Sequence, residues 1–394
     1  MAQILQTFWE NFRHNLFKPL LLFFYMGFLV PILRVEFEFP HIIYQGLTIY
    51  LLVSIGWHGG EELAKLDNTI LTQALKFMGV GFVTNFVIGV LAYMLLRSLT
   101  KLRRVDAATV AGYYGSDSAG TFATCMGVLN GLIIAGQTEF KPAAYMPVML
   151  AVMEIPGCLV ALFLVSRLRH DGMDALGFMP DEEGYDVKAV APVSINPHGH
   201  GHAMDEGELG LVAKPPGLFS AALLHEVFFN PGLYLLFGGI LIGFLSQKQG
   251  NNVTKEDDVL FLGLFQGLLC LFLLEMGMTA SRKLKDLKRG GVPFIILGLA
   301  MPVLFATIGI VVAHLFSMAV HQELTLGTYV LFSVLCSAAS YIAVPAVQRL
   351  AIPEASPTLP LAASLGLTFS FNVTIGIPMY IEIARGLTKA FPAV

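Results

Sequence analysis

The stretch Tyr113–Thr121 reads Tyr-Tyr-Gly-Ser-Asp-Ser-Ala-Gly-Thr, and it lies inside a hydrophobic segment long enough to cross a membrane. Val105–Gly112 precedes it and Phe122–Ala135 follows it. Glycine adopts backbone angles that end a helix, and Ser, Asp and Thr cap the helix that follows, so the stretch predicts an interrupted span. A carboxylate such as Asp117 costs at least about 2.5–3.5 kcal/mol at bilayer depth. Asp117 therefore needs a partner or a water-filled cavity; the plainer alternative is a kink with a buried, hydrogen-bonded Asp.

The composition is that of a polytopic membrane protein. Of the 394 residues, 55% are hydrophobic and 13% are charged, whereas soluble proteins carry about 25% charged residues. The mean hydropathy is +0.70. A net charge of −4 gives no electrostatic basis for binding nucleic acid. The four cysteines lie in apolar runs without CxxC spacing, which predicts packing residues and not disulfides or metal ligands.

The hydrophobic runs predict an all-α fold of ten membrane spans in two sets of five, measured with about 20 apolar residues per span. The first set is expected at 16–34, 39–57, 72–97, 107–135 and 142–167, and the second at 222–246, 259–280, 291–319, 324–351 and 358–388. Residues 168–220 are rich in Asp, Glu, Pro and Gly, which predicts a long hydrophilic loop. The expected domains are a first repeat over 1–167, this linker, and a second repeat over 221–394.

The ninth predicted span contains a counterpart of the first interruption. Leu335–Val347 holds small residues, two serines and Pro345 within a hydrophobic segment. Proline removes a backbone donor and fits the first turn of a restarted helix. Spans four and nine are therefore predicted to break at equivalent places, with half-helices starting near 118–121 and 343–346. Two repeats of an odd number of spans are inverted relative to each other, which is a plan of secondary transporters.

Basic residues predict the orientation of the chain. The densest clusters, at 97–104 and 282–289, fall on one face, which the positive-inside rule assigns to the cytoplasm. Both termini are then expected outside and the central loop inside. His198, His200 and His202 alternate in this loop, a pattern able to bind zinc or nickel weakly. No Cys or fixed scaffold accompanies them, and their role stays open.

The crossed half-helices predict two adjacent ion sites. Half-helix N-termini offer free N–H groups and a positive dipole end for an anion; the residues expected there are Gly115, Ser116, Ser118, Ala119, Gly120, Thr121, Ser340, Tyr341, Ile342 and Ala343. Carbonyls at the C-terminal ends, with carboxylates and hydroxyls, suit a hard monovalent cation; the residues expected there are Asp117, Ser337, Glu154, Asn372 and Thr374. Glu154 has the equal alternative of bracing the core, and Asn372 and Thr374 that of interhelical hydrogen bonds.

These residues resemble the sodium-dependent bicarbonate permeases. The likeness runs from about Leu20 to Leu387 outside the central loop, and its most telling pieces are Asp106-Ala107 before Gly112–Thr121, Met276-Gly277-Met278 before a basic cluster, and Ile342–Pro353 followed by Asn372–Pro378. The resemblance implies sodium-coupled bicarbonate import by a homotrimer in the bacterial inner membrane, with Na⁺ as coupling ion and no other cofactor. It also implies an elevator-like mechanism in which spans 3–5 and 8–10 move against spans 1, 2, 6 and 7. A small PII-like protein is the cytoplasmic regulator that it implies.

The chain departs from the pattern of that family at the site. Ser118 and Thr121 match the family's hydroxyls, but the family has an aspartate where Tyr341 stands and an apolar residue at the position of Asp117. Sodium/proton antiport stays open, because a carboxylate beside broken helices also serves proton exchange. Symport of another small anion or a monocarboxylate also stays open. An intramembrane hydrolase using Asp117 and Glu154 is the enzyme alternative, and it needs two carboxylates close enough to share a proton.

Overall fold

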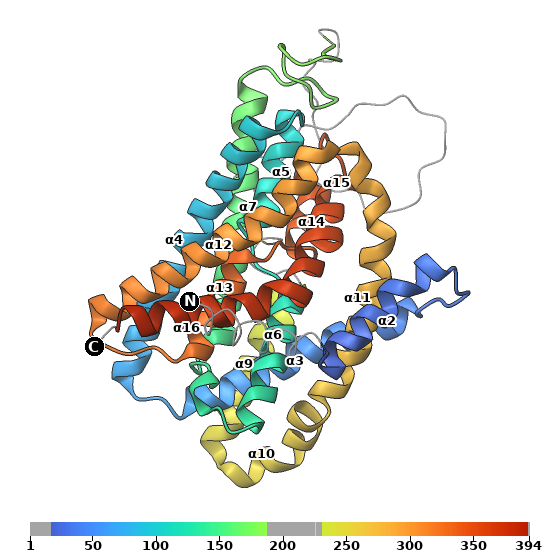
Figure 1. Ribbon diagram of the computed structural model, residues 1–394. Helices are drawn as coiled ribbons and strands as arrows, with labels where there is room; N and C mark the ends of the chain where they lie inside the picture. The colour runs from blue at the N-terminus through green and yellow to red at the C-terminus, as the bar shows by residue number, and fades with distance from the viewer. Residues whose placement is uncertain (1–16, 187–224, 226–230, 393–394) are drawn as a thin grey trace.

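The computed structural model describes residues 17–186, 225 and 231–392. These described residues form helices and no strands (Figure 1). The elements, in chain order, are α2 (Pro19–Leu33), α3 (His41–Ala64), α4 (Asn68–Leu99), α5 (Arg104–Tyr114), α6 (Ala119–Ile134), η1 (Thr138–Phe140), α7 (Met146–His170), α9 (Pro231–Gln249), α10 (Asn251–Asp258), η3 (Val259–Gly263), α11 (Phe265–Lys283), η4 (Leu284–Arg289), α12 (Gly291–Val320), α13 (Leu326–Ser337), α14 (Ala343–Ala351), α15 (Leu359–Leu361), η5 (Ala362–Phe369), η6 (Asn372–Gly376) and α16 (Ile377–Ala390).

Length and hydropathy mark several of these helices as candidate membrane spans. Among the described residues five stretches qualify: Thr69–Leu99, Met146–His170, Val253–Lys288, Gly291–Val320 and Leu359–Ala390. The apolar helices α2 and α13 are shorter. The helix α13 is short because it ends at an interruption. For the same reason α5, which ends at an interruption, and α6, which begins at one, are short. An integral membrane protein is therefore the class that both composition and helix lengths support.

Both predicted interruptions are present in the structure. The expected span 107–135 is divided into α5 and α6, and 324–351 into α13 and α14, with Pro345 in the first turn of α14. The tenth expected span instead contains two π-helical segments, η5 and η6, between the short α15 and α16. The expected second span ends at 57, whereas α3 continues to Ala64. His198, His200 and His202, like most of the predicted loop, lie outside the described residues.

The helices α2, α3, α9 and α11 pack on one another in two close pairs, and we call them the scaffold (Figure 1). In the pair α3 and α9, a Cβ added at Gly243 would lie 2.2 Å from the carbonyl oxygen of Trp57. In the pair α2 and α11, a Cβ at Gly277 would lie 2.2 Å from the carbonyl oxygen of Phe24. Glycine is required at both positions because the two backbones touch, which is the small-residue packing typical of membrane helices.

The remaining long helices form a second group, which we call the core. Here α4, α5 and α7 contact one another, and so do α12, α13 and α16. Phe77 of α4 joins the two sets, since its ring lies 4.6 Å from that of Phe316 on α12 and 4.6 Å from that of Phe332 on α13. The four half-helices, α5, α6, α13 and α14, pack mainly on helices of the core. The scaffold helices α2, α3 and α11 contact α6 less extensively.

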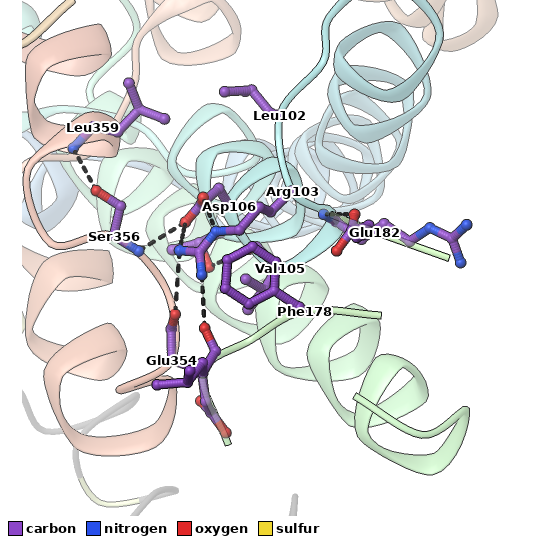
Figure 2. Close-up of polar contacts among 12 residues, drawn as sticks. Leu102, Arg103, Val105, Asp106, Phe178, Glu182, Glu354, Ser356 and Leu359 are labelled. Atoms are coloured by element: carbon purple, nitrogen blue, oxygen red, sulfur yellow. Dashed lines mark hydrogen bonds and ion pairs between the residues drawn. The ribbon is translucent and has the colours of Figure 1, made fainter. Parts of the chain in front are cut away.

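Polar contacts hold the first turn of α5 to the segment after α14 (Figure 2). A carboxylate oxygen of Asp106 accepts a hydrogen bond from the Ser356 amide at 2.7 Å. Arg103 forms an ion pair with Asp106 at 2.8 Å and donates to the carbonyl oxygen of Glu354 at 3.4 Å. The guanidinium of Arg103 also lies over the ring of Phe178, 4.9 Å from its centroid. The start of one interrupted helix is thereby anchored to the end of the other.

The first turn of α13 is held in a corresponding way to the segment after α6. The hydroxyl of Thr328, the third residue of α13, accepts a hydrogen bond from the Ala143 amide at 2.9 Å. Asp106 is likewise the third residue of α5. At the far ends, Arg169 of α7 donates to the carbonyl oxygen of Ala351 at the end of α14, whereas Arg385 of α16 donates to the side chain of Gln137 after α6. The helix α7 therefore contacts the end of α14, and α16 contacts the segment after α6.

Part of the predicted hydrophilic loop is folded onto the core. One carboxylate oxygen of Asp174 accepts hydrogen bonds from the amides of Leu176 and Phe178, at 2.9 and 2.8 Å. The backbone amide of Arg104 donates to Glu182 at 2.8 Å, next to the Arg103 cluster (Figure 2). The segment over 171–186 therefore belongs structurally with α5 and α7, a fold that its polar composition did not predict.

Candidate functional site

The first interruption runs from Gly115 to Ser118 and uses short polar side chains to satisfy the backbone. Ser116 Oγ donates to the carbonyl oxygen of Glu154 on α7 at 2.7 Å. Ser118 is the N-cap of α6, where its Oγ accepts the amide of Thr121 at 3.2 Å. The cap satisfies one of the four amides that a helix start leaves without an intrahelical acceptor. The first turn of α6 retains further free donors for a ligand.

Asp117 lies in the middle of this interruption and is fully buried, with 0% of its surface exposed. Neither of its carboxylate oxygens has a hydrogen-bond partner among the described residues. Glu154 lies close enough to interact with it electrostatically. An isolated buried carboxylate costs several kcal/mol unless a counter-charge or a proton compensates it. The position is therefore suited to a bound cation or proton.

Asn85 of α4 belongs to the same region, and the sequence reasoning did not select it. Its side-chain nitrogen donates to the carbonyl oxygens of Met153 at 3.0 Å and Leu335 at 3.5 Å. Met153 directly precedes Glu154, the carboxylate that interacts with Asp117. The side-chain oxygen of Asn85 is buried and lacks a partner within the described part of the chain. The available signal was one Asn in an apolar run, which equally indicates a residue that joins two helices.

The second interruption, Ala338 to Ile342, contacts the first one directly. The Ser340 amide donates to the carbonyl oxygen of Tyr113 in the last turn of α5, at 2.9 Å. Ser340 Oγ accepts the amide of Val344 in α14 at 3.4 Å. Ser340 is therefore hydrogen-bonded both to the end of α5 and to the start of α14. Two segments more than 200 positions apart meet through their backbones.

Asn372 and its neighbours hold the end of α13. The side-chain nitrogen of Asn372 donates to the carbonyl oxygen of Ser337 at 3.1 Å, and the side-chain oxygen accepts from the Tyr380 hydroxyl at 2.6 Å. Both ends of this amide are thus used by the protein. Thr374 donates to the carbonyl oxygen of Ser370, one turn earlier in its own helix. The polar groups at the end of α13 are thus paired, in contrast to the carboxylate of Asp117 in the first interruption.

Tyr341 from the second interruption lies against the first turn of α6. A Cβ added at Gly120 would be only 1.9 Å from the Tyr341 hydroxyl oxygen. This hydroxyl lies beside Ser118 and Gly120, yet among the described residues it has no hydrogen bond of normal geometry. The ring packs edge-on against Phe369 with centroids 5.6 Å apart. The hydroxyl oxygen therefore lies at the helix start, where it faces the Gly120 amide.

Most of the predicted site residues lie at these two adjoining interruptions. They are Gly115, Ser116, Asp117, Ser118, Ala119, Gly120, Thr121, Ser337, Ser340, Tyr341, Ile342 and Ala343. Glu154 and Asn372 flank them from α7 and η6. Thr374 contacts its own helix and neither interruption by a described hydrogen bond. Chemically, the arrangement offers unpaired oxygens to a cation next to free N–H and O–H donors for an anion.

Comparison with known protein families matches residues 19–385 to the Na⁺-dependent bicarbonate transporter superfamily. No curated protein matches the chain. The matched residues include the scaffold, both interruptions and the helices that flank them. Since the match extends over most of the chain, the protein belongs to the Na⁺-dependent bicarbonate transporter superfamily.

Proposed function

We propose that the protein is a secondary transporter that carries Na⁺ and bicarbonate in the same direction, with both ions bound at the two interruptions. The observation that carries the proposal is the carboxylate of Asp117, buried and unpartnered just before the start of α6. A buried negative charge favours a cation, and a helix N-terminus favours an anion. Because the two sites adjoin, an anion binds best when the cation already neutralises Asp117. Membership of the superfamily supports Na⁺ and bicarbonate as the two ions.

We assign the Na⁺ site to Asp117, the side-chain oxygen of Asn85 and the carboxylate of Glu154. Oxygen ligands suit a hard cation, and the oxygens of Asp117 and Asn85 have no acceptor role within the described structure. Ser337 ends α13 nearby and offers its hydroxyl. Asn372 and Thr374 are left out of the assigned site because their polar atoms already bond to the protein.

We assign bicarbonate to the first turn of α6. Ser118 caps the amide of Thr121, which leaves the amides of Ala119 and Gly120 without intrahelical acceptors. The Tyr341 hydroxyl lies beside them and adds a neutral donor. The first turn of α14 adds the Ala343 amide, because the Val344 amide donates to Ser340 Oγ and Pro345 has no N–H. Backbone N–H groups and one hydroxyl are suited to a small oxyanion, because a helix N-terminus can bind an anion without a positively charged side chain.

We further propose two inverted repeats of five spans, over 1–167 and 221–394, that work by an elevator-like movement. The contacts around Asp106 and Thr328 support this plan, because each is the third residue of an interrupted helix and each accepts an amide from beyond the other interruption. The pairing of α2 with α11 and of α3 with α9 supports it as well, since these pairs are exchanged by the same symmetry. The separate packing of the scaffold fits a core that moves past it.

The cellular setting follows from the resemblance and the charge pattern. We propose a homotrimer in the lipid of the bacterial inner membrane, with both termini outside and the linker in the cytoplasm. A PII-like protein that docks on the linker would bind full-length protein but not a variant lacking 187–212. We choose this deletion because it retains the folded segment that contacts Arg104 through Glu182. Unchanged binding after the deletion would exclude the linker as the docking element.

The proposed function is tested by uptake of labelled bicarbonate into proteoliposomes under an imposed Na⁺, K⁺ or proton gradient. We expect uptake driven by the Na⁺ gradient alone. Uptake driven equally by K⁺, or no uptake, would contradict the proposal. Na⁺-driven proton movement without bicarbonate would favour the antiporter, to which a buried Asp117 beside Glu154 is also suited. The hydrolase alternative has no support from the family.

A further inference from the structure

Aromatic side chains of the scaffold cover the first turn of α6. A Cβ added at Gly120 would lie 3.1 Å from Cε1 of Phe272, so the edge of this ring rests on the helix start. Phe272 belongs to α11 and is only 2% exposed. Its ring stacks on Tyr44 of α3, with centroids 5.9 Å apart and an interplanar angle of 15°. Two scaffold helices therefore supply one wall of the proposed anion site.

The other wall comes from the second interruption, and its rings also contact a scaffold helix in this structure. Tyr341 packs edge-on against Phe369, and Phe369 packs edge-on against Phe24 of α2, with centroids 5.9 Å apart. The hydroxyl of Tyr341 is the nearest atom to a Cβ placed at Gly120, and it lies beside Ser118. The start of α6 is thus enclosed by one hydroxyl and by rings that offer no hydrogen-bond donor.

The two walls differ in what they can contribute to an anion. Tyr341 moves with the core, because it belongs to the second interruption, and its hydroxyl is a hydrogen-bond donor. Phe272 stays with the scaffold and has no polar atom. It can therefore exclude water and large substituents from the site, but it cannot form a hydrogen bond with the anion. Movement of α6 along α11 would take Gly120 from under the ring and open the site.

Resting on the proposed function, we propose that Phe272 is the gate residue that closes the anion site and limits its cargo to small anions. A rigid ring in contact with the helix start leaves no room for an anion with a large substituent. Apolar pockets separate ligands that differ by one methylene by roughly 10–200-fold. Truncation of Phe272 should therefore admit larger carboxylates while the donors of α6 continue to bind bicarbonate.

The test measures Na⁺-driven bicarbonate uptake in proteoliposomes with formate, acetate, butyrate or benzoate as competitor. In the unaltered protein we expect inhibition by formate and not by benzoate. In Phe272→Ala we expect benzoate to compete at a concentration lower by at least about tenfold, and in Phe272→Leu we expect a smaller change. If Phe272→Ala takes up no bicarbonate, the comparison is made with Phe272→Leu. In that variant we expect butyrate to inhibit uptake at a lower concentration than in the unaltered protein.

The matched control is Phe294→Ala, which removes a fully buried ring on α12. It should lower stability without changing which anions compete. Equal competition profiles in the unaltered protein, Phe272→Ala and Phe272→Leu would overturn the gate while leaving the transport function intact. Failure of the unaltered protein to take up bicarbonate with Na⁺ would instead contradict the function itself.

Discussion

The two interruptions adjoin each other, but they differ in how their polar groups are satisfied. In the first, Asp117 is fully buried and has no hydrogen-bond partner among the described residues. In the second, the carbonyl oxygen of Ser337 and both ends of the Asn372 amide are paired, and Tyr380 completes the set. The first interruption therefore holds an unpartnered buried carboxyl group, whereas the second has a hydrogen-bonded end of α13 and, at Tyr341, an unpaired but neutral hydroxyl.

This difference suggests that the two interruptions have different roles in the proposed transport. Uncompensated buried charge destabilises a protein, and it is retained in membrane helices mainly at functional sites. This contrast supports the proposal that the charged cation ligand comes from the first interruption, whereas the second contributes the neutral Tyr341 hydroxyl and the fixed end of α13. Ser340, which donates to the carbonyl oxygen of Tyr113, couples the two. We therefore expect an ion bound at Asp117 to affect the end of α5 and, through Ser340, the start of α14.

The largest expected effect comes from Asp117→Asn. This change keeps the shape and removes the charge, so Na⁺ should bind at least about 100-fold more weakly, in line with about 3–5 kcal/mol for breaking a buried charge pair. Na⁺ should raise the melting temperature of the unaltered protein but not that of the variant. Uptake at varied Na⁺ concentrations measures the Na⁺ affinity, and thermal unfolding with and without Na⁺ measures the shift in melting temperature.

The matched control for that change is Glu62→Gln, which removes a carboxylate that pairs with Lys65 outside the site. Its Na⁺ dependence should equal that of the unaltered protein. Normal sodium activation in Asp117→Asn would remove Asp117 from the cation site.

Asn372→Ala should have the next largest effect, and on a different quantity. The change leaves the Ser337 carbonyl and the Tyr380 hydroxyl without their partner, at about 1–3 kcal/mol for each orphaned group. We expect lower thermal stability and less transport, but an unchanged Na⁺ concentration for half-maximal uptake. A shift of that concentration by tenfold or more, about 1.4 kcal/mol, would make Asn372 a ligand and erase the contrast between the interruptions.

Gly120→Ala tests the contact between the interruptions. The new methyl group would overlap the Tyr341 hydroxyl, and such overpacking costs about 1–3 kcal/mol. Transport and stability should fall, and adding Tyr341→Phe should restore part of the stability because it removes the clashing oxygen. Thermal unfolding of the two single variants and the double variant provides the comparison. Strictly additive losses would show that the two residues do not touch.

The smallest effect is expected for Thr374→Val. The hydroxyl bonds only to the carbonyl of its own helix in the described structure, and substitutions of this kind change stability by about 0.5 kcal/mol or less. Na⁺-dependent uptake should be normal. A marked loss of sodium affinity would return Thr374 to the cation site.

Local residue chemistry was enough to predict where the helices are interrupted. Gly115 and the capping Ser118 determine the first interruption, and Pro345 the start of α14, because these residues act within one turn of helix. The adjacency of the interruptions was expected from repeat symmetry, and the Ser340 contact with Tyr113 agrees with it.

Tertiary contacts explain what the sequence did not reveal. Asn85 is distinguished from an ordinary interhelical Asn only by its unpaired oxygen, which depends on α7 and α13. Asn372 was predicted either as a cation ligand or as an interhelical hydrogen-bonding residue, and its bonds to the Ser337 carbonyl and the Tyr380 hydroxyl depend on tertiary packing. The π-helical segment η5 has no marker in composition, and the position of Phe272 over Gly120 requires the packing of scaffold on core.

The most direct test is an experimental density map of the protein in a lipid environment, determined once with Na⁺ and bicarbonate and once with K⁺ as the sole cation. The account predicts an ion density bridging the Asp117 carboxylate and the Asn85 side-chain oxygen in the first map, with an anion at the first turn of α6, and neither in the second. A sodium ion bound at Asn372 with Asp117 still unpartnered would contradict it.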